Sequence, residues 1–185
     1  MTRKIAVLVG SLRKDSFSRK IARNIAALAP AGYTFEEVDI SKVGFYNQDL
    51  DSNAPAEWLD LRAKVNSADA VLFVTPEYNR SVPGVLKNAI DILSRPYGHS
   101  AFNGKPAAVV SNSPGNIGGF GAHHHLRQPL AFLNMPILQQ PEMYLSGVGD
   151  WFDDEGKIKK EETRKFLAQF AKTFANWIEK TALAK

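Results

Sequence analysis

The chain has 185 residues, of which 44% are hydrophobic and 23% charged, so it is long enough for one domain with a buried core and too apolar to be disordered. It contains no cysteine, which excludes disulfides and thiol chemistry, so any redox chemistry must belong to a cofactor. Apolar runs are shorter than the ~18 residues that cross a bilayer, and the N-terminal run is too short for a signal peptide. We expect a cytoplasmic protein with no membrane partner.

The net charge of +4 is unevenly distributed along the chain. Residues 1–23 carry seven Lys or Arg and one Asp, whereas residues 24–185 carry sixteen Lys or Arg and eighteen acids. A basic segment of this kind could bind nucleic acid or form a solvated helix face. Since it brackets a hydroxyl-rich loop and lacks interleaved aromatics, we favour a positive field for a phosphorylated ligand and expect no nucleic-acid partner.

Hydrophobic patterning predicts strands and helices in regular alternation. In chain order we expect a strand over 4–9, a helix over 17–28, a strand over 34–40, a helix over 55–67, a strand over 70–75, a helix over 85–93 and a strand over 106–111. A glycine-rich loop then leads into a helix ending near 133, and residues 136–138 open a fifth strand. The last predicted element is an amphipathic helix over 160–178 whose apolar face carries Phe166, Phe170, Phe174, Trp177 and Ile178.

This alternation predicts an α/β fold. Right-handed crossovers over five parallel strands give a flavodoxin-like three-layer sandwich with the sheet order 2-1-3-4-5. We expect a single domain over 1–185, with the C-terminal helix, extended to 160–181, packed on the sheet. Ligands of such sheets bind beyond the carboxyl ends of the strands, where the order reverses between strands 1 and 3. The loops that meet there are residues 10–18, 75–83 and 111–119.

The first of these loops suits a phosphate group. It has neither the Gly-x-Gly-x-x-Gly pattern of dinucleotide sites nor the Gly-x4-Gly-Lys-[Ser/Thr] pattern of ATP sites. It offers instead the guanidinium of Arg13, the start of a helix, and the hydroxyls of Ser11, Ser16 and Ser18, which fit a phosphate monoester. The alternative is an ordinary strand–helix connection with Asp15 or Ser16 as the helix N-cap. We call residues 10–18 the phosphate loop.

The other two loops suit a flat ring and a close backbone approach. Residues 75–83, the ring loop, have prolines near both ends and Tyr78 between them, so they could lie along a heterocycle; the alternative is a simple turn. Residues 111–119, the glycine loop, contain Gly115, Gly118 and Gly119. These glycines could let the backbone approach a ligand closely; the alternative is that they only make a turn flexible. Strand 3 is followed by no phospho-acceptor Asp, and no Ser or Cys stands in a nucleophile elbow, which disfavours receiver domains and hydrolases.

These motifs resemble a known family, the NAD(P)H-dependent FMN reductases, in its bacterial chromate, quinone and azo-dye reductase branch. The resemblance rests on the phosphate loop, on residues 75–91, and on Gly118-Gly119 followed by residues 125–128. It implies an enzyme that binds FMN, takes electrons from NADPH or NADH, and passes two of them to quinones, chromate, azo compounds or free flavin by a ping-pong mechanism. It also implies a homodimer or homotetramer with the flavin near a subunit boundary.

The resemblance also implies which residues hold the cofactor. Around the FMN phosphate it places Ser11, Arg13, Ser16, Phe17 and Ser18. Along the isoalloxazine ring it places Pro76, Glu77, Tyr78 and Asn79, with Ser113 and Gly115 flanking the other side. Substrate contacts are expected at Arg80, Gly118 and Gly119. No side chain is expected to act as a catalytic residue, because the flavin carries the chemistry.

Two other functions compete with this interpretation. A flavodoxin-type electron carrier would bind FMN without nicotinamide turnover, but such carriers usually have a Thr/Gly-rich phosphate loop and an acidic surface. A metal could bind at residues 123–125, three consecutive histidines. Consecutive residues of a helix point in different directions, so we expect no metal and instead histidines at the surface or at an interface.

Two smaller features have open interpretations. Trp151 and Phe152 lie in a polar segment and either cover a neighbouring subunit or its flavin, or form a local hydrophobic cluster. Glu36, Glu37 and Asp39 resemble the ribose-binding acid of a dinucleotide fold. Because the glycine fingerprint is absent, we interpret these acids as a solvated strand face and its end.

Overall fold

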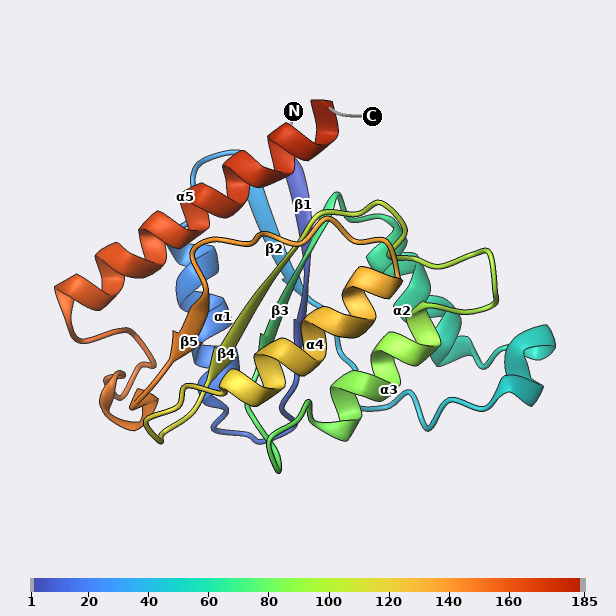
Figure 1. Cartoon of the computed structure of the whole chain (residues 1–185), viewed down its shortest axis with the longest axis horizontal. Coiled ribbons are helices and arrows are strands. Elements are labelled where there is room, and N and C mark those ends of the chain that lie inside the picture. The colour runs from blue at the N-terminus through green and yellow to red at the C-terminus, as the bar shows by residue number, and fades with distance from the viewer. Residues whose placement is uncertain (1, 184–185) are drawn as a thin grey trace.

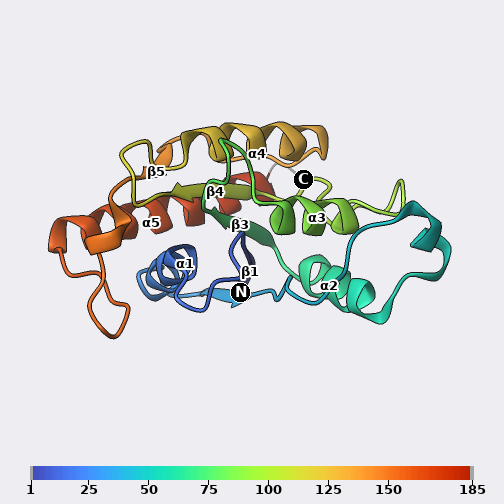
Figure 2. The ribbon, with the colours of Figure 1, turned by 90° about the horizontal axis from the view of Figure 1, so that it is seen from below.

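The computed structural model describes residues 2–183 and contains a five-stranded parallel sheet of order β2-β1-β3-β4-β5. The strands are β1 (Arg3–Val9), β2 (Tyr33–Glu37), β3 (Ala70–Thr75), β4 (Ala107–Asn112) and β5 (Met143–Leu145). The α-helices are α1 (Phe17–Ala27), α2 (Ala56–Asn66), α3 (Gly84–Leu93), α4 (Phe120–Phe132) and α5 (Glu161–Leu183), with 3₁₀ turns at Gln48–Asn53 and Val148–Asp150. The predicted flavodoxin-like sandwich is confirmed (Figures 1 and 2).

Two hydrophobic cores form because the central strands are buried on both faces. In β3, Val71 and Phe73 point into the core shared with α2, α3 and α4, whereas Leu72 and Val74 point into the core shared with α1 and α5. Figure 2 shows α1 and α5 on one side of the sheet and α2 and α3 on the other. This double burial explains why β1, β3 and β4 read as continuous apolar runs rather than alternating ones.

The C-terminal helix closes the second core. Phe170 and Phe174 of α5 are buried and stack at 6.3 Å between ring centroids. Trp177 donates its indole N–H to the carbonyl of Pro136 at 2.9 Å, which joins the helix to the chain between α4 and β5. The prediction for Phe166 was wrong, because its side chain is 44% exposed, although the next residue, Leu167, is buried in the core. Within residues 2–183, no helix combines the length and the apolar content that a membrane span requires.

The fifth strand begins later than predicted. Near residue 136 the chain makes only an isolated bridge between Ile137 and Ala107, and the ladder with β4 begins at Met143. Proline has no N–H for the ladder, and Pro136 and Pro141 bracket the segment that leaves the sheet. The second strand also ends early, at Glu37 instead of residue 40. Glu36, Glu37 and Asp39 are exposed, as predicted.

The sheet brings the three predicted loops together. β3 lies between β1 and β4, with Val9 opposite Val74 and Thr75 opposite Ser111, so the three strands end side by side. Gly10 then turns close against β3, where a Cβ atom would lie 2.9 Å from the Thr75 hydroxyl oxygen. The loops after β1, β3 and β4 therefore meet at the point where the strand order reverses.

The three consecutive histidines of α4 have three different surroundings. His123 is only 1% exposed, so the prediction of surface or interface histidines was wrong for this residue. Its ring meets the edge of Tyr144 at 4.7 Å, and burial, with the charge of Arg127, lowers the pKa of His123 to about 3. His124 bonds the Tyr144 hydroxyl at 2.9 Å and His125 bonds Ser81 at 3.0 Å. No His, Asp and Glu cluster suited to a metal occurs in the described part of the chain.

Burial of His123 predicts an acid-dependent loss of stability. The unfolded chain takes up a proton on this imidazole near its ordinary pKa of about 6.5, whereas the folded chain does so only near 3. Between these values the unfolded state holds more protons, so the free energy of unfolding falls as pH falls, by up to about 1.4 kcal/mol per pH unit. Urea unfolding of His123→Phe should show a shallower decline from pH 6.5 to 4 than the wild type. His124→Phe, at an exposed position, is the control, and identical slopes in all three proteins would refute the assignment.

Candidate functional site

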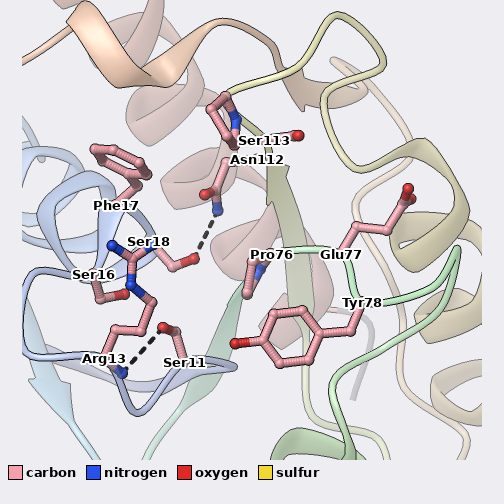
Figure 3. A pocket seen from close by; sticks show the side chains of 11 residues that line it. Ser11, Arg13, Ser16, Phe17, Ser18, Pro76, Glu77, Tyr78, Asn112 and Ser113 are labelled. Carbon is pink, nitrogen blue, oxygen red and sulfur yellow. Dashed lines mark hydrogen bonds between the residues drawn. The ribbon is translucent and has the colours of Figure 1, made fainter.

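A pocket of about 130 Å³ lies where the three loops meet (Figure 3). Its lining residues are Ser11, Arg13, Ser16, Phe17, Ser18, Pro76, Glu77, Tyr78, Asn112, Ser113 and Pro114. All of these except Asn112 and Pro114 were predicted from the sequence as cofactor contacts. Two predicted contacts, Asn79 and Gly115, do not line the pocket.

The phosphate loop presents three buried hydroxyls, each of which already accepts one hydrogen bond from the protein. Ser16 is the N-cap of α1 and accepts the N–H of Arg19 at 3.2 Å; Ser11 accepts the N–H of Arg13 at 3.4 Å. Ser18 accepts the amide of Asn112 at 2.9 Å. In residues 2–183 none of the three serine hydroxyls donates a hydrogen bond to the protein, so their protons remain available to a ligand. A phosphate monoester dianion only accepts hydrogen bonds and therefore fits this pocket.

Two arginines of this region have separate roles. Arg19 donates to the carbonyl of Arg13 at 3.0 Å and to that of Ser11 at 3.3 Å, and it pairs with Glu37, so it fixes the course of the phosphate loop. Arg13 lies with its guanidinium carbon 5.9 Å from the centre of the Phe17 ring. Like the Lys20 hydrogen bond, which has the larger effect, its charge helps to lower the pKa of Asp15, but within residues 2–183 it forms no ion pair, and it lines the pocket.

Fewer basic residues of the segment 1–23 are unpaired than the sequence indicated. Arg3 pairs with Glu179 and Asp69, and Lys4 pairs with Glu36. Lys20 pairs with Asp15 inside the phosphate loop itself. With Arg19, four of the seven basic residues of 1–23 thus have carboxylate partners, and Arg13 is the basic residue that lines the pocket.

Asn112 is the main residue that the sequence analysis missed. Its side chain is 2% exposed, and its Nδ2 donates to the Ser18 hydroxyl at 2.9 Å and to the Thr75 carbonyl at 3.1 Å. One amide therefore joins the ends of β4 and β3 to the first turn of α1. The available signal was a buried strand that ends in two polar residues, Ser111 and Asn112, at the carboxyl edge of the sheet.

The tip of the ring loop is a two-residue hairpin. Tyr78 and Ser81 exchange backbone hydrogen bonds of 3.1 and 3.0 Å, and Asn79 and Arg80 between them have left-handed φ angles of 51° and 63°. Asparagine tolerates this conformation better than most residues, which gives Asn79 a role in the turn, outside the pocket. Tyr78 is 52% exposed and lines the pocket, as Pro76 does.

The carboxylate of Glu77 does not face the pocket. Figure 3 shows it pointing away from Pro76 and Tyr78. It accepts the N–H of Ala122 in α4 at 3.0 Å and pairs with Arg80 at 2.7 Å. Burial alone would raise the pKa of Glu77, but the Ala122 N–H and the Arg80 guanidinium hold it below its usual value.

The glycine loop needs its glycines for packing. Gly118 and Gly119 are buried with φ angles of 63° and 77°, and a Cβ on Gly118 would lie 2.6 Å from the carbonyl carbon of Tyr144. Gly115 donates its N–H to the Ser113 hydroxyl at 3.0 Å. It therefore orients the side chain of Ser113, which lines the pocket, without lining the pocket itself. Substrate contact at Gly118, Gly119 and Arg80 stays a prediction.

Trp151 and Phe152 pack within their own chain. Phe152 stacks on Phe17 with 6.2 Å between ring centroids, and the Lys20 ammonium lies 5.7 Å from the Phe152 ring. Both aromatics are partly buried against the core of α1 and α5. This supports the local-cluster interpretation and places Phe152 behind Phe17, a residue that lines the pocket.

Comparison with known proteins shows the family of the chain. The family model of the NADPH-dependent FMN reductases matches residues 3–150, which contain all three loops. A quinone reductase of Pseudomonas putida is 55% identical over 176 residues, covering 95% of this chain and 94% of the relative. A 2-hydroxy-1,4-benzoquinone reductase of a Burkholderia species is 46% identical over 178 residues, covering 96% and 97%.

The solved structures agree as well. FerB from Paracoccus denitrificans, a flavoenzyme NAD(P)H:(acceptor) oxidoreductase, superposes with a TM-score of 0.92 at 41% identity, covering 97% of this chain and 99% of that one. Sequence, fold and pocket thus agree that the chain belongs to the NADPH-dependent FMN reductase family, whose members are FMN-dependent, NAD(P)H-using oxidoreductases.

Proposed function

We propose that this enzyme passes two electrons from NADPH or NADH to quinones, and also to chromate, azo compounds and free flavin, by a ping-pong mechanism. The observation that carries the proposal is the pocket of Figure 3, in which a donor-rich phosphate half adjoins the ring loop. The names of the relatives support quinones as one acceptor class. A cytoplasmic location is part of the proposal, because NAD(P)H is held there.

The residues divide the work of holding FMN. Ser11, Ser16 and Ser18 would donate hydrogen bonds to the phosphate, with Arg13 supplying the charge. Pro76 and Tyr78 would lie along the ring. Bound FMN supplies the chemistry, since it accepts two electrons from a nicotinamide and gives them to an acceptor.

No carboxylate of the pocket is placed to transfer a proton to a ligand. Glu77 is the only carboxylate among the lining residues, and both of its oxygens are engaged outside the pocket. The protein's contribution is therefore to bind and orient. Tyr78 is half exposed, so the ring side of the site is open, and an open stacking surface supports broad acceptor use. One surface used in turn by nicotinamide and acceptor also supports the ping-pong order.

Arg13, Lys14 and Arg80 would attract anionic acceptors such as chromate. Arg13 lines the pocket, whereas Arg80 is paired with Glu77. The charge effect is long-range and weakens with salt. This part of the proposal requires that chromate turnover fall with ionic strength more than turnover of a neutral quinone.

We also propose that the protein is a homodimer or homotetramer. A largely apolar groove lies between α3 and α4 and is lined by Ser81, Val82, Lys87, Ile90, His125, Leu126, Gln128, Pro129 and Phe132. Phe132 is 86% exposed there, and Ser81 and Val82 belong to the ring loop. A second copy covering this groove would bring the flavin near a subunit boundary. Light scattering should show a dimer or tetramer that Phe132→Lys weakens; a wild-type monomer at micromolar concentration would contradict the proposal.

Anaerobic stopped-flow spectroscopy tests the catalytic proposal. The FMN-loaded protein mixed with NADPH should lose its visible flavin absorption at a rate that accounts for steady-state turnover, and added 1,4-benzoquinone should restore it. Initial rates at several NADPH and quinone concentrations should give parallel double-reciprocal lines. Bleaching far slower than turnover would favour a flavodoxin-type electron carrier, and intersecting lines would reject the ping-pong order.

A further inference from the structure

We propose that Glu77 is a positioning residue: its carboxylate, seated on the first turn of α4 at Gly121 and Ala122, latches the ring loop in the conformation that holds the flavin ring. We call these contacts, together with the Arg80 ion pair, the Glu77 latch. The inference rests on the proposed function, because it assumes that FMN binds in the pocket of Figure 3. It assigns the Glu77 carboxylate a role in holding the ring loop, although its sequence neighbours Pro76 and Tyr78 line the pocket.

Both carboxylate oxygens of Glu77 are engaged. Oε2 accepts the N–H of Ala122 at 3.0 Å, and Oε1 accepts the Arg80 guanidinium at 2.7 Å. The Glu77 side chain is 10% exposed and that of Arg80 is 69% exposed, so the Ala122 contact is largely shielded from water and the Arg80 ion pair lies at the surface. The N-cap of α4 is Gly119, which has no side chain to cap the free N–H groups of the first turn. Glu77 supplies that anionic cap from another part of the chain.

Gly121 makes the close approach possible. A Cβ atom at this position would lie 2.6 Å from the carbonyl oxygen of Arg80 and 2.9 Å from Oε2 of Glu77. The first of these is a backbone atom, so the clash could be relieved only by moving the loop or the helix. A glycine is unfavourable within a helix, and here its missing side chain is what allows the ring loop to rest on α4.

The loop has a reason to need a latch. Asn79 and Arg80 are consecutive non-glycine residues in the left-handed region, a conformation that persists only where surrounding contacts hold it. The Tyr78–Ser81 backbone pair holds the turn itself, and His125 holds Ser81 to α4 at 3.0 Å. The Glu77 latch is the tie directly beside Tyr78, the residue that faces the pocket.

The latch and the phosphate half of the site are separate. The hydroxyl donors belong to the phosphate loop, which is held by Asn112 and Arg19, and neither of these contacts Glu77. Asn112 bonds the ring loop only at its first residue, Thr75, at the end of β3. Weakening the latch should therefore weaken binding of the ring and leave binding of a phosphate group unchanged. A general loss of folding would weaken both.

A matched pair of glycine substitutions tests this. Gly121→Ala places a methyl group against the ring loop, whereas Gly84→Ala, also in the first turn of a helix, meets no atom within 4 Å. We would measure the FMN Kd by quenching of flavin fluorescence, and the affinity for ribose 5-phosphate, a ring-free phosphate monoester, by competition with FMN. Gly121→Ala and Glu77→Gln should each raise the FMN Kd about tenfold, since a charge-assisted hydrogen-bond set is disturbed. Ribose 5-phosphate affinity should change less than twofold, and Gly84→Ala should change neither.

Each other outcome decides against the inference. If FMN binds both altered proteins as it binds the wild type, the latch does not position the ring loop. If FMN and ribose 5-phosphate affinities fall together, the residues are merely structural. Glu77→Gln decides the matter if Gly121→Ala does not fold. A wild-type protein that binds no FMN overturns the proposed function together with the latch, whereas a wild type that binds FMN separates the two.

Discussion

The geometry of the site depends on the side-chain amide of Asn112. Parallel strands bring their carboxyl ends to one edge of a sheet, but they do not by themselves fix the loops that follow. Asn112 donates to Ser18 in α1 and to the Thr75 carbonyl at the end of β3, in a place where water is excluded. An unpaired amide buried there would cost about 1–3 kcal/mol, which favours the arrangement in which the three segments meet.

That amide also decides what the pocket can bind. Because Ser18 accepts from Asn112, its hydroxyl proton is directed elsewhere, and Ser16 is in the same position because it caps α1. The capping role and the binding role of Ser16, which the sequence left as alternatives, are therefore compatible: one uses the lone pair and the other the proton. With Arg13 added, the phosphate half offers donors and positive charge.

The fold and the three site loops were predictable because local patterns carry them, and the family resemblance supplied further lining residues such as Phe17 and Ser113. Strands buried on both faces give continuous apolar runs, and the three unusual loops follow three of these strands. What was missed depends on contacts between distant segments. Asn112 resembles a turn residue until Ser18 is seen beside it, and β5 begins at Met143 because the preceding chain leaves the ladder.

Contacts between distant segments also explain the remaining errors of the sequence analysis. His123 looks like its two neighbours in sequence, and its burial beside Tyr144 of β5 appears only in the fold. The basic excess of residues 1–23 looked unopposed because its acids, such as Glu179 and Glu36, lie far away in sequence. Asn79 stands within a ring-binding motif, yet its left-handed φ angle places it at the tip of a turn.

Calorimetric titration of the protein with FMN and with riboflavin is the most direct test of the central claim, that the pocket is built around a phosphate dianion. The two ligands share the ring and differ in the phosphate, which several charge-assisted hydrogen bonds of about 1.5–3 kcal/mol each would recognise. We predict that riboflavin binds at least about 100-fold more weakly than FMN, even after the non-additivity of such bonds is allowed for. Equal affinities for the two ligands would contradict the account.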